Sequence, residues 1–485
     1  MVAPVRVRFA PSPTGEPHVG SLRTALFNYL FARQHRGTFI VRIEDTDRSR
    51  LVPGSDQRMF DALAWIGITM DEGPPVGGPH RPYVQSERLV LYREHAATLV
   101  AAGHAYECYC TTERLARLRA QGSVATMYDR TCRDLTEEER SQRRASGAPT
   151  VIRLKVPESG TFAHRDLIRG EVSFAASTVD DTVLMKSDGF PTYHLAHVVD
   201  DHLMEISHVI RGEEWLPSLP KHLCLYQAFG WAPPQFAHLP LLLGKDRSKL
   251  SKRHGSFSVQ RFQDEGYVPP AVANFLALLG WNPGDERELF TLDELIHAFS
   301  LERVQPSGAV FDETKLAWMN LQHLRRFSDD EYGAQVQMYL KRIPSGVGER
   351  PPPWFALLAR AVRERVKRFA DIPALIGFVE ALPPYEPRLL VPKKHTAAQA
   401  RDGLAVARQA LQVLPEAHWN VDAIRQGLDQ AGQQVGDRTS VLWTTRVAIT
   451  GQAVSPPVYE STALLDRAEA LQRLSVAEER LNALR

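Results

Sequence analysis

Apolar and polar residues follow two different repeats over the first 85 residues. Strand-like runs cover residues 5–10 and 38–44. After the first run, apolar side chains recur at three- and four-residue steps from Leu22 to Leu30, which is typical of a helix, and residues 59–65 predict another helix. Strands that alternate with helices predict an α/β fold with a doubly wound, Rossmann-like parallel sheet.

The strand and helix alternation breaks at about residue 86 and resumes at Tyr193. The intervening stretch contains the highly charged residues 136–144 and an Asp188-Gly189 pair, which favours a tight turn within residues 185–190. Further strand-like runs at residues 209–211 and 239–243 predict the second half of the sheet. Residues 86–192 therefore predict an insertion that splits the α/β fold.

From about residue 245 the pattern is mainly helical. Thr291 and Glu294 have the spacing of a capping box, and a proline-rich break at residues 351–353 precedes further helices. We therefore expect all-α C-terminal domains and five segments in total, with these bounds: 1–85, 86–192, 193–244, 245–326 and 327–485.

Composition narrows the class of protein. The chain has 485 residues, 44% of them hydrophobic, and a formal net charge of +1. No apolar run approaches the roughly 20 residues that span a bilayer, and the N-terminus lacks a hydrophobic signal segment. These features predict a cytoplasmic protein of several domains with no membrane partner. They exclude a general polycation that coats nucleic acid, but they permit a local RNA-binding face.

Three cysteines form a candidate metal site. Cys108 and Cys110 are two residues apart, and Cys132 follows after a short loop, whereas Cys224 stands alone. Structural zinc usually takes four ligands, so the fourth would be Tyr128 or Asp134. Alternatively, the cysteines are small buried hydrophobic residues that bind no metal. The spacing leaves both interpretations open.

Two distant segments have the chemistry of a triphosphate site. Residues 11–15 follow the first strand-like run and lead into His18-Val19-Gly20-Ser21 at the start of the first helix. A helix N-terminus offers free amides to phosphate, and a glycine allows close approach. Residues 249–253 (Lys-Leu-Ser-Lys-Arg) supply further cations on a segment rich in glycine and serine. Together these segments predict attack on ATP at phosphorus.

These segments resemble the HIGH and KMSKS signatures of class I aminoacyl-tRNA synthetases. The sequence of residues 8–15 is similar to that of bacterial glutamyl-tRNA synthetases in particular, and further similar stretches run in order to about Leu324, at residues 41–47, 193–196, 199–202 and 210–215. Ser21 replaces the final histidine of HIGH, so its share of phosphate binding must come from a hydroxyl or from helix amides.

The resemblance implies that ATP, with Mg²⁺, activates L-glutamate and that tRNA then accepts it, with negligible activation in the absence of tRNA. A carboxylate needs no base for this attack, so alignment and charge stabilisation suffice. The implied catalytic residues are His18, Lys249, Ser251 and Lys252. The implied ATP site comprises Pro13, Thr14, Gly15, His18, Gly20, Ser21, Lys249 and Lys252.

A glutamate pocket needs a cation for each carboxylate and an anion for the ammonium group. By resemblance, Arg8 and Arg211 supply the guanidinium groups and Glu44 takes the ammonium group. Alternatively, Arg8 and Glu44 form a structural ion pair between neighbouring strands. The assignment of each arginine to a carboxylate stays open. The implied pocket comprises Arg8, Ala10, Ser12, Glu44, Tyr193, His197 and Arg211.

Two further clusters have more than one interpretation. Asp200, Asp201 and His202, with the nearby His194 and His197, could bind a metal, although structural and ribose contacts are the favoured alternative. The acidic residues at 44–47 could bind Mg²⁺ or Ca²⁺, or they could fix their loop through hydrogen bonds.

The resemblance also assigns partners. It places the acceptor end of tRNA on residues 86–192, the stem on residues 245–326 and the anticodon on residues 327–485, with Arg363, Arg365 and Arg368 as candidate contacts. It implies a monomer that charges tRNA(Glu), with tRNA(Gln) open, and it is compatible with structural Zn²⁺ at the cysteines. The rival functions are a glutaminyl-tRNA synthetase, a shortened tRNA-modifying relative and a catalytically silent RNA-binding scaffold.

Overall fold

The computed structural model describes residues 4–121, 127–250, 257–343 and 346–484. Its internal contacts divide the chain into two compact units. The first contains Met1–Phe262 and Pro269–Glu313, and the second contains Gln263–Val268 and Thr314–Arg485. No helix in the described ranges is both long enough and apolar enough to cross a membrane.

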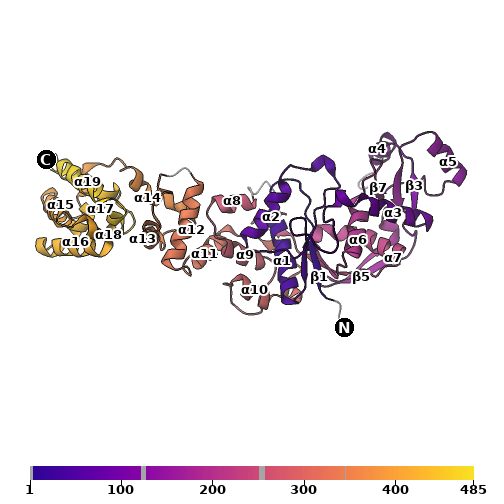
Figure 1. Cartoon of the computed structure of the whole chain (residues 1–485), viewed down its shortest axis with the longest axis horizontal. Coiled ribbons are helices and arrows are strands. Elements are labelled where there is room, and N and C mark those ends of the chain that lie inside the picture. The colour runs from indigo at the N-terminus through magenta and orange to yellow at the C-terminus, as the bar shows by residue number, and fades with distance from the viewer. Residues whose placement is uncertain (1–3, 122–126, 251–256, 344–345, 485) are drawn as a thin grey trace. The chain divides into compact units, whose positions relative to one another are not determined.

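A four-stranded parallel sheet lies in the first unit, in the order β2-β1-β8-β9. Figure 1 labels its strand β1 next to helix α1. This sheet confirms the doubly wound α/β fold. Arg8 pairs in register with Ile40, and Arg211 pairs with His238. The strands are β1 (Arg6–Phe9), β2 (Thr38–Val41), β8 (His208–Gly212) and β9 (Gln235–Leu239).

Helices cover both faces of this sheet. On one face α1 packs against β1, β2 and β8 and also contacts α2, α9 and α10. On the other face, fully buried residues such as Val209 and Phe236 share a core with Leu195 and Leu225. The bounds are α1 (Val19–Gln34), α2 (Ser55–Trp65), α3 (Leu89–Ala101), α6 (Tyr193–Leu203), α7 (Leu219–Phe229), α9 (Pro269–Ala277) and α10 (Leu292–Ala298).

The strand expected at residues 239–243 is wrong in its extent. β9 ends at Leu239, and a separate short strand, β10 (Leu242–Leu243), pairs with β11 (Ala309–Val310). Pro240 lies at the break and has no N–H group for a ladder hydrogen bond. The apolar run at residues 239–243 therefore contributes to strands of two different sheets.

The inserted residues form two small sheets of their own. One is antiparallel, in the order β3-β4-β7, and the other is the hairpin of β5 and β6. Gly189 adopts a φ of +80° in the expected tight turn, although the chain returns through a single bridge from Met185 to Pro191. The elements are β3 (Ala105–Cys108), α4 (Thr112–Gln121), α5 (Glu137–Ala145), β4 (Val151–Leu154), β5 (Thr161–Asp166), β6 (Gly170–Ala175) and β7 (Val183–Met185).

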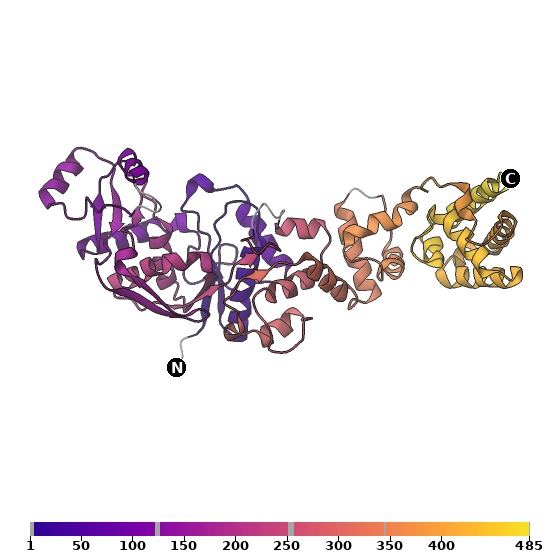
Figure 2. The same cartoon turned by 180° about the vertical axis from the view of Figure 1, so that it is seen from behind.

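The later part of the chain is helical, as expected, and Thr291 and Glu294 form the expected capping box at the start of α10. In the second unit, α15 packs against α16, α17 and α19 near the C-terminus (Figure 2). The helices are α8 (Val259–Asp264), α11 (Glu313–Leu324), α12 (Asp329–Arg342), α13 (Pro352–Val362), α14 (Ile372–Glu380), α15 (Ala397–Gln412), α16 (Val421–Val435), α17 (Arg438–Thr450), α18 (Val458–Ala463) and α19 (Arg467–Asn482).

Candidate active site

A cavity of about 620 Å³ opens at the carboxyl ends of β1, β2 and β8. Ligands of open parallel sheets bind at this edge because the loops that follow the strands meet there. The cavity brings together six of the residues expected to bind glutamate: Arg8, Ala10, Ser12, Glu44, Tyr193 and Arg211. The seventh, His197, is fully buried beside Arg8 and Arg211.

Buried ion pairs hold Arg8 and Glu44 in place. Arg8 Nε donates to Asp201 Oδ1 at 3.1 Å, while Arg42 donates to Asp201 Oδ1 at 2.7 Å and to Glu44 Oε1 at 3.0 Å. The alternative of a structural pair between Arg8 and Glu44 is therefore wrong, since each pairs with another residue. Burial raises the pKa of Glu44, and the charge of Arg42 opposes this shift.

Of the two interpretations of the cluster around Asp200 and Asp201, the structure agrees with the favoured structural one and not with a metal site. Asp200 accepts hydrogen bonds from Gln85 at 2.9 Å, Arg88 at 2.7 Å and Tyr92 at 2.8 Å. Both aspartates are buried and neutralised by arginine, and a metal-compatible group was found elsewhere in the described residues, at the three cysteines. These aspartates are structural.

The acidic loop at residues 44–47 is fixed by hydrogen bonds. Asp45 accepts from the Ser86 amide at 2.8 Å, and Asp47 accepts from the Ser49 hydroxyl at 2.7 Å. This arrangement matches the loop-fixing alternative. It also aligns Glu44 with the cavity, since the Glu44 amide donates to the carbonyl of Pro11 at 3.0 Å.

Arg211 has different surroundings from Arg8. Its Nε donates to His238 Nε2 at 3.1 Å, and its Nη1 donates to the Tyr193 hydroxyl at 3.0 Å and to His222 Nδ1 at 3.2 Å. Burial lowers the pKa of both histidines, so the imidazoles are neutral. Among the described residues, the acceptors that contact Arg211 thus carry no charge.

His18 lies at the N-terminus of α1, next to the large cavity. The amide of Gly20 donates to His18 Nδ1 at 3.2 Å, so the ring caps the helix. Burial lowers the pKa of His18. Because Nδ1 accepts a hydrogen bond, the proton of the neutral ring resides on Nε2. The expected helix start is confirmed, and the helix begins three residues before Leu22.

A second cavity, of about 290 Å³, places His18, Gly20 and Ser21 beside Lys249 and Leu250. The chain is described again from residue 257. There the Val19 amide donates to the Phe257 carbonyl at 3.0 Å, and the Val259 amide donates to the Pro17 carbonyl at 2.9 Å. Two sequence-distant segments therefore meet at His18. Ser251 and Lys252 lie outside the described residues.

The loop between β1 and α1 lines a third cavity, of about 190 Å³, which includes Pro13, Thr14, Gly15 and His18. Gly15 is held by Ser55, whose hydroxyl accepts from its amide at 2.7 Å and donates to its carbonyl at 2.6 Å. Thr14 and Ser21 also line the large cavity. The residues expected at the ATP site that the structure describes thus lie along one connected rim.

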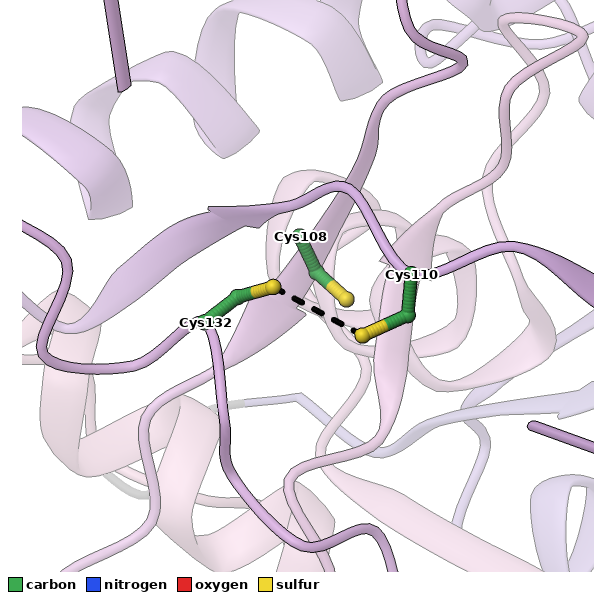
Figure 3. Close-up of side chains that lie close together, drawn as sticks. All are labelled: Cys108, Cys110 and Cys132. Carbon is green, nitrogen blue, oxygen red and sulfur yellow. Dashed lines mark hydrogen bonds between the residues drawn. The ribbon is translucent and has the colours of Figure 1, made fainter. Parts of the chain in front are cut away.

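The three cysteines converge in the inserted segment, with their sulfur atoms turned toward one another (Figure 3). All three sulfurs lie within 4.8 Å of one another. The Tyr128 hydroxyl is 3.3 Å from both Cys108 Sγ and Cys110 Sγ, whereas Asp134 is exposed and falls outside this group. The donor set fits a tetrahedral zinc site with Tyr128, not Asp134, as the nearby fourth group.

The candidate tRNA contacts in the second unit already bind protein groups. Arg363 donates to the carbonyl of Ser328 at 2.9 Å, Arg365 donates to the carbonyl of Ser455 at 2.6 Å, and Arg368 pairs with Glu265 at 2.6 Å. Arg365 is the exposed member of the three.

Sequence reasoning missed several buried groups that shape the cavity, namely Arg42, Asp166, His222 and His238. Arg42 contacts Asp201 and Glu44, His222 and His238 contact Arg211, and Asp166 contacts His238. Asp166, His222 and His238 lie outside the stretches that carry the family resemblance. Asp201 was noticed, and a structural role was the favoured interpretation, but its arginine partners were not identified. The only available signal was a polar residue inside an apolar strand, as at His238.

Comparisons with known proteins agree with this geometry. Residues 4–318 match the family described as tRNA synthetases class I (E and Q), catalytic domain, and residues 320–478 match an anticodon binding domain. A glutamate–tRNA ligase of Dehalococcoides mccartyi is 44% identical over 100% of this chain and 99% of its own. One of Moorella thermoacetica is 45% identical over 98% of each chain.

Solved structures give the same result. The crystal structure of a glutamate tRNA ligase from Elizabethkingia meningosepticum, in complex with its amino acid, has a TM-score of 0.85 and 35% identity. It covers 98% of this chain and 99% of that chain. From its sheet, its cavity and these full-length similarities, the chain belongs to the glutamate–tRNA ligase family of class I tRNA synthetases.

Proposed function

We propose that this chain uses ATP to convert L-glutamate into glutamyl-adenylate and then transfers the glutamyl group to the 3′ end of tRNA(Glu), releasing pyrophosphate and AMP. The observation that carries the choice of glutamate is Arg211. Arg211 is 4% exposed and lines the cavity, and among the described residues neutral acceptors hold its guanidinium group.

Charge balance supports an acidic substrate. At and beneath the cavity, Arg8, Arg42 and Arg88 form direct ion pairs with the carboxylates of Glu44, Asp200 and Asp201, whereas the described residues that Arg211 contacts include no carboxylate. The side-chain carboxylate of glutamate would give Arg211 a direct anionic partner. The neutral amide of glutamine would leave this buried guanidinium without one.

The same balance suggests which arginine takes the side-chain carboxylate. Asp201 already compensates Arg8, with two contacts at 3.1 and 3.2 Å. We therefore assign the side-chain carboxylate to Arg211, with Tyr193 alongside, and place the ammonium group on Glu44. Ser12 adds a hydroxyl contact, Ala10 lines the pocket, and His197 supports Arg8 from below.

The ATP phosphates would lie at the start of α1. His18 would donate from Nε2 to the phosphate that is transferred, while amides near Gly20 and Ser21 and the hydroxyl of Ser21 supply further donors. Lys249, Ser251 and Lys252 would hold the leaving pyrophosphate. ATP enters as its Mg²⁺ complex, in which the ion neutralises phosphate charge. Since the attacking carboxylate is already ionised, these groups need only align the reactants and stabilise the charge that is transferred.

We further propose that residues 86–192 receive the acceptor end of tRNA, residues 245–326 contact the stem, and residues 327–485 bind the anticodon. Arg365 is the best placed of the three candidate arginines because it is exposed. Replacing it with alanine should weaken tRNA binding without changing the KM for glutamate.

We propose structural Zn²⁺ at Cys108, Cys110, Cys132 and Tyr128. The purified protein should contain about one zinc per chain by elemental analysis, as a single tetrahedral site requires. Cys110→Ser should lose it, whereas Asp134→Ala, the matched control, should keep it. A zinc-free wild type would instead favour the interpretation of buried thiols.

The direct test of the reaction is aminoacylation of purified tRNA(Glu) with radiolabelled glutamate. The wild type should charge this tRNA and form AMP, and omitting tRNA should abolish ATP–pyrophosphate exchange. Lys252→Ala should slow activation severely while it keeps tRNA affinity. A scaffold that only binds RNA would bind tRNA equally in both proteins and charge it in neither.

The rival functions have weaker support. The first unit is followed by a match to an anticodon binding domain, which a shortened tRNA-modifying relative would lack. Relatives that match the whole chain are named for glutamate. Charging of purified tRNA(Gln) with glutamate would decide whether the enzyme accepts both tRNAs, and sedimentation analysis would test the expected monomer.

A further inference from the structure

A chain of three side chains leads from the inserted hairpin to the glutamate pocket. Asp166, at the end of β5, accepts a hydrogen bond from His238 Nδ1 at 2.6 Å. His238, on β9, in turn accepts from Arg211 Nε at 3.1 Å. Asp166 and His238 are buried and do not line the cavity, whereas Arg211 does.

Asp166 sets the tautomer of His238. Its Oδ1 accepts from the amides of Ile168 at 3.0 Å and Arg169 at 2.9 Å, and these bonds, with that of His238, lower its pKa. An ionised carboxylate only accepts, so His238 must carry its proton on Nδ1. Its Nε2 lone pair then faces Arg211.

This arrangement orients a guanidinium without neutralising it. Arg211 and His238 are direct neighbours in register on β8 and β9, so the contact is set by the sheet. A carboxylate at the position of His238 would pair with Arg211 and compete with the substrate. A neutral imidazole supplies the same geometry and leaves the positive charge for a ligand.

The anchor comes from a separate part of the chain. Asp166 lies 72 residues before His238, and the turn after it also supplies Arg169, which forms an ion pair with Glu213 directly after β8. The Glu213 carboxylate accepts from the Leu241 amide at 3.0 Å, just past β9. The turn between β5 and β6 is thus linked, through Arg169 and Glu213, to the ends of β8 and β9, which carry Arg211 and His238.

We infer that Asp166 and His238 are positioning residues that hold Arg211 in the orientation and charge state needed to select the side-chain carboxylate of glutamate. This inference rests on the proposed function. It adds two residues from beneath the pocket to the set that determines specificity.

A matched pair of substitutions tests the inference. In His238→Asn the amide can still donate to Asp166, but it falls short of Arg211. In His238→Gln the longer side chain returns an acceptor to Arg211. In aminoacylation assays, we expect His238→Asn to raise the KM for glutamate about 10-fold or more, as one lost hydrogen bond to a charged group would do. His238→Gln should stay within about 3-fold of the wild type.

The ATP and glutamine kinetics distinguish positioning from a general structural role. The KM for ATP and the residual kcat/KM for glutamine should be unchanged in His238→Asn. Asp166→Asn is an independent variant, because an amide there can donate to Nδ1 and turn a proton toward Arg211; it should also raise the KM for glutamate.

The inference is overturned if His238→Asn and His238→Gln give the same KM for glutamate, if the KM values for ATP and glutamate rise together, or if Asp166→Asn matches the wild type. A wild type that fails to charge tRNA(Glu) with glutamate would instead refute the proposed function.

Discussion

In the proposed reaction, His18 has two roles. Its Nδ1 caps α1 through the Gly20 amide, and its Nε2 proton would be donated to a phosphate. An asparagine at this position can still cap the helix through its side-chain oxygen, whereas alanine cannot. The two substitutions therefore separate the structural role from the catalytic one.

We predict that His18→Asn slows adenylate formation by about 10²-fold, the usual effect of removing one donor to a developing anion. Its free energy of unfolding should stay near that of the wild type. His18→Ala should lose a similar amount of activity and, in addition, about 1 kcal/mol of stability. Rapid-quench kinetics and urea unfolding measure these quantities. Full activity in His18→Asn would show that the ring only caps the helix.

The neutral histidines around Arg211 predict an effect of pH on stability. Burial lowers the pKa of His194 to about 3 and holds those of His197, His222 and His238 below the usual 6.5. These imidazoles protonate near pH 6.5 only in the unfolded chain, so acidification favours unfolding. The loss should begin near pH 6.5 and grow by about 1.4 kcal/mol per pH unit for each histidine.

Urea unfolding between pH 7.5 and 5.5 measures this slope. The raised pKa of Glu44 acts in the opposite direction, but this single carboxyl group offsets only part of the effect of the four histidines. His194→Gln should reduce the slope by about one proton. A free energy of unfolding that stays constant from pH 7.5 to 5.5 would contradict the assignment of neutral buried imidazoles.

At the level of elements, the start of α1 is joined to the start of α8. The backbone pairs Val19 with Phe257 and Val259 with Pro17, and the ring of Phe257 also lies edge-on to His18. These contacts attach the segment that follows residues 249–253 to the segment that carries His18. The join is made by backbone groups, so sequence patterns could not reveal it.

Val259→Pro tests this join selectively. Val259 is the first residue of α8, where proline is tolerated, and Ser258 before it is in a β-bridge. The substitution removes only the amide that donates to Pro17. We predict at least a 10-fold slower activation with a stability loss of about 1 kcal/mol. Val259→Ala keeps the amide and should keep the activation rate; equal rates in the two variants would contradict the prediction.

For the whole molecule, the sequence predicted the parallel sheet and the helical C-terminal region because both depend on local periodicity. It failed at residues 239–243, where an apolar run continues across Pro240 into a second sheet. It favoured structural roles for Asp200 and Asp201 over metal binding, but only the fold shows that Arg8, Arg42 and Arg88 neutralise them. His222 and His238, two of the partners of Arg211, lie on α7 and β9, outside the stretches that carry the family resemblance.

The central claim is that the buried guanidinium group of Arg211 binds the side-chain carboxylate of glutamate and thereby selects this substrate. The most direct measurement is the ratio of kcat/KM for L-glutamate to that for L-glutamine in charging tRNA(Glu), in the wild type and in Arg211→Gln. We predict a wild-type ratio of at least about 10²-fold, because glutamine would leave this charge unpaired. The ratio should collapse toward unity in Arg211→Gln. An unchanged ratio in that variant, or a wild type that uses both amino acids equally, would contradict the account.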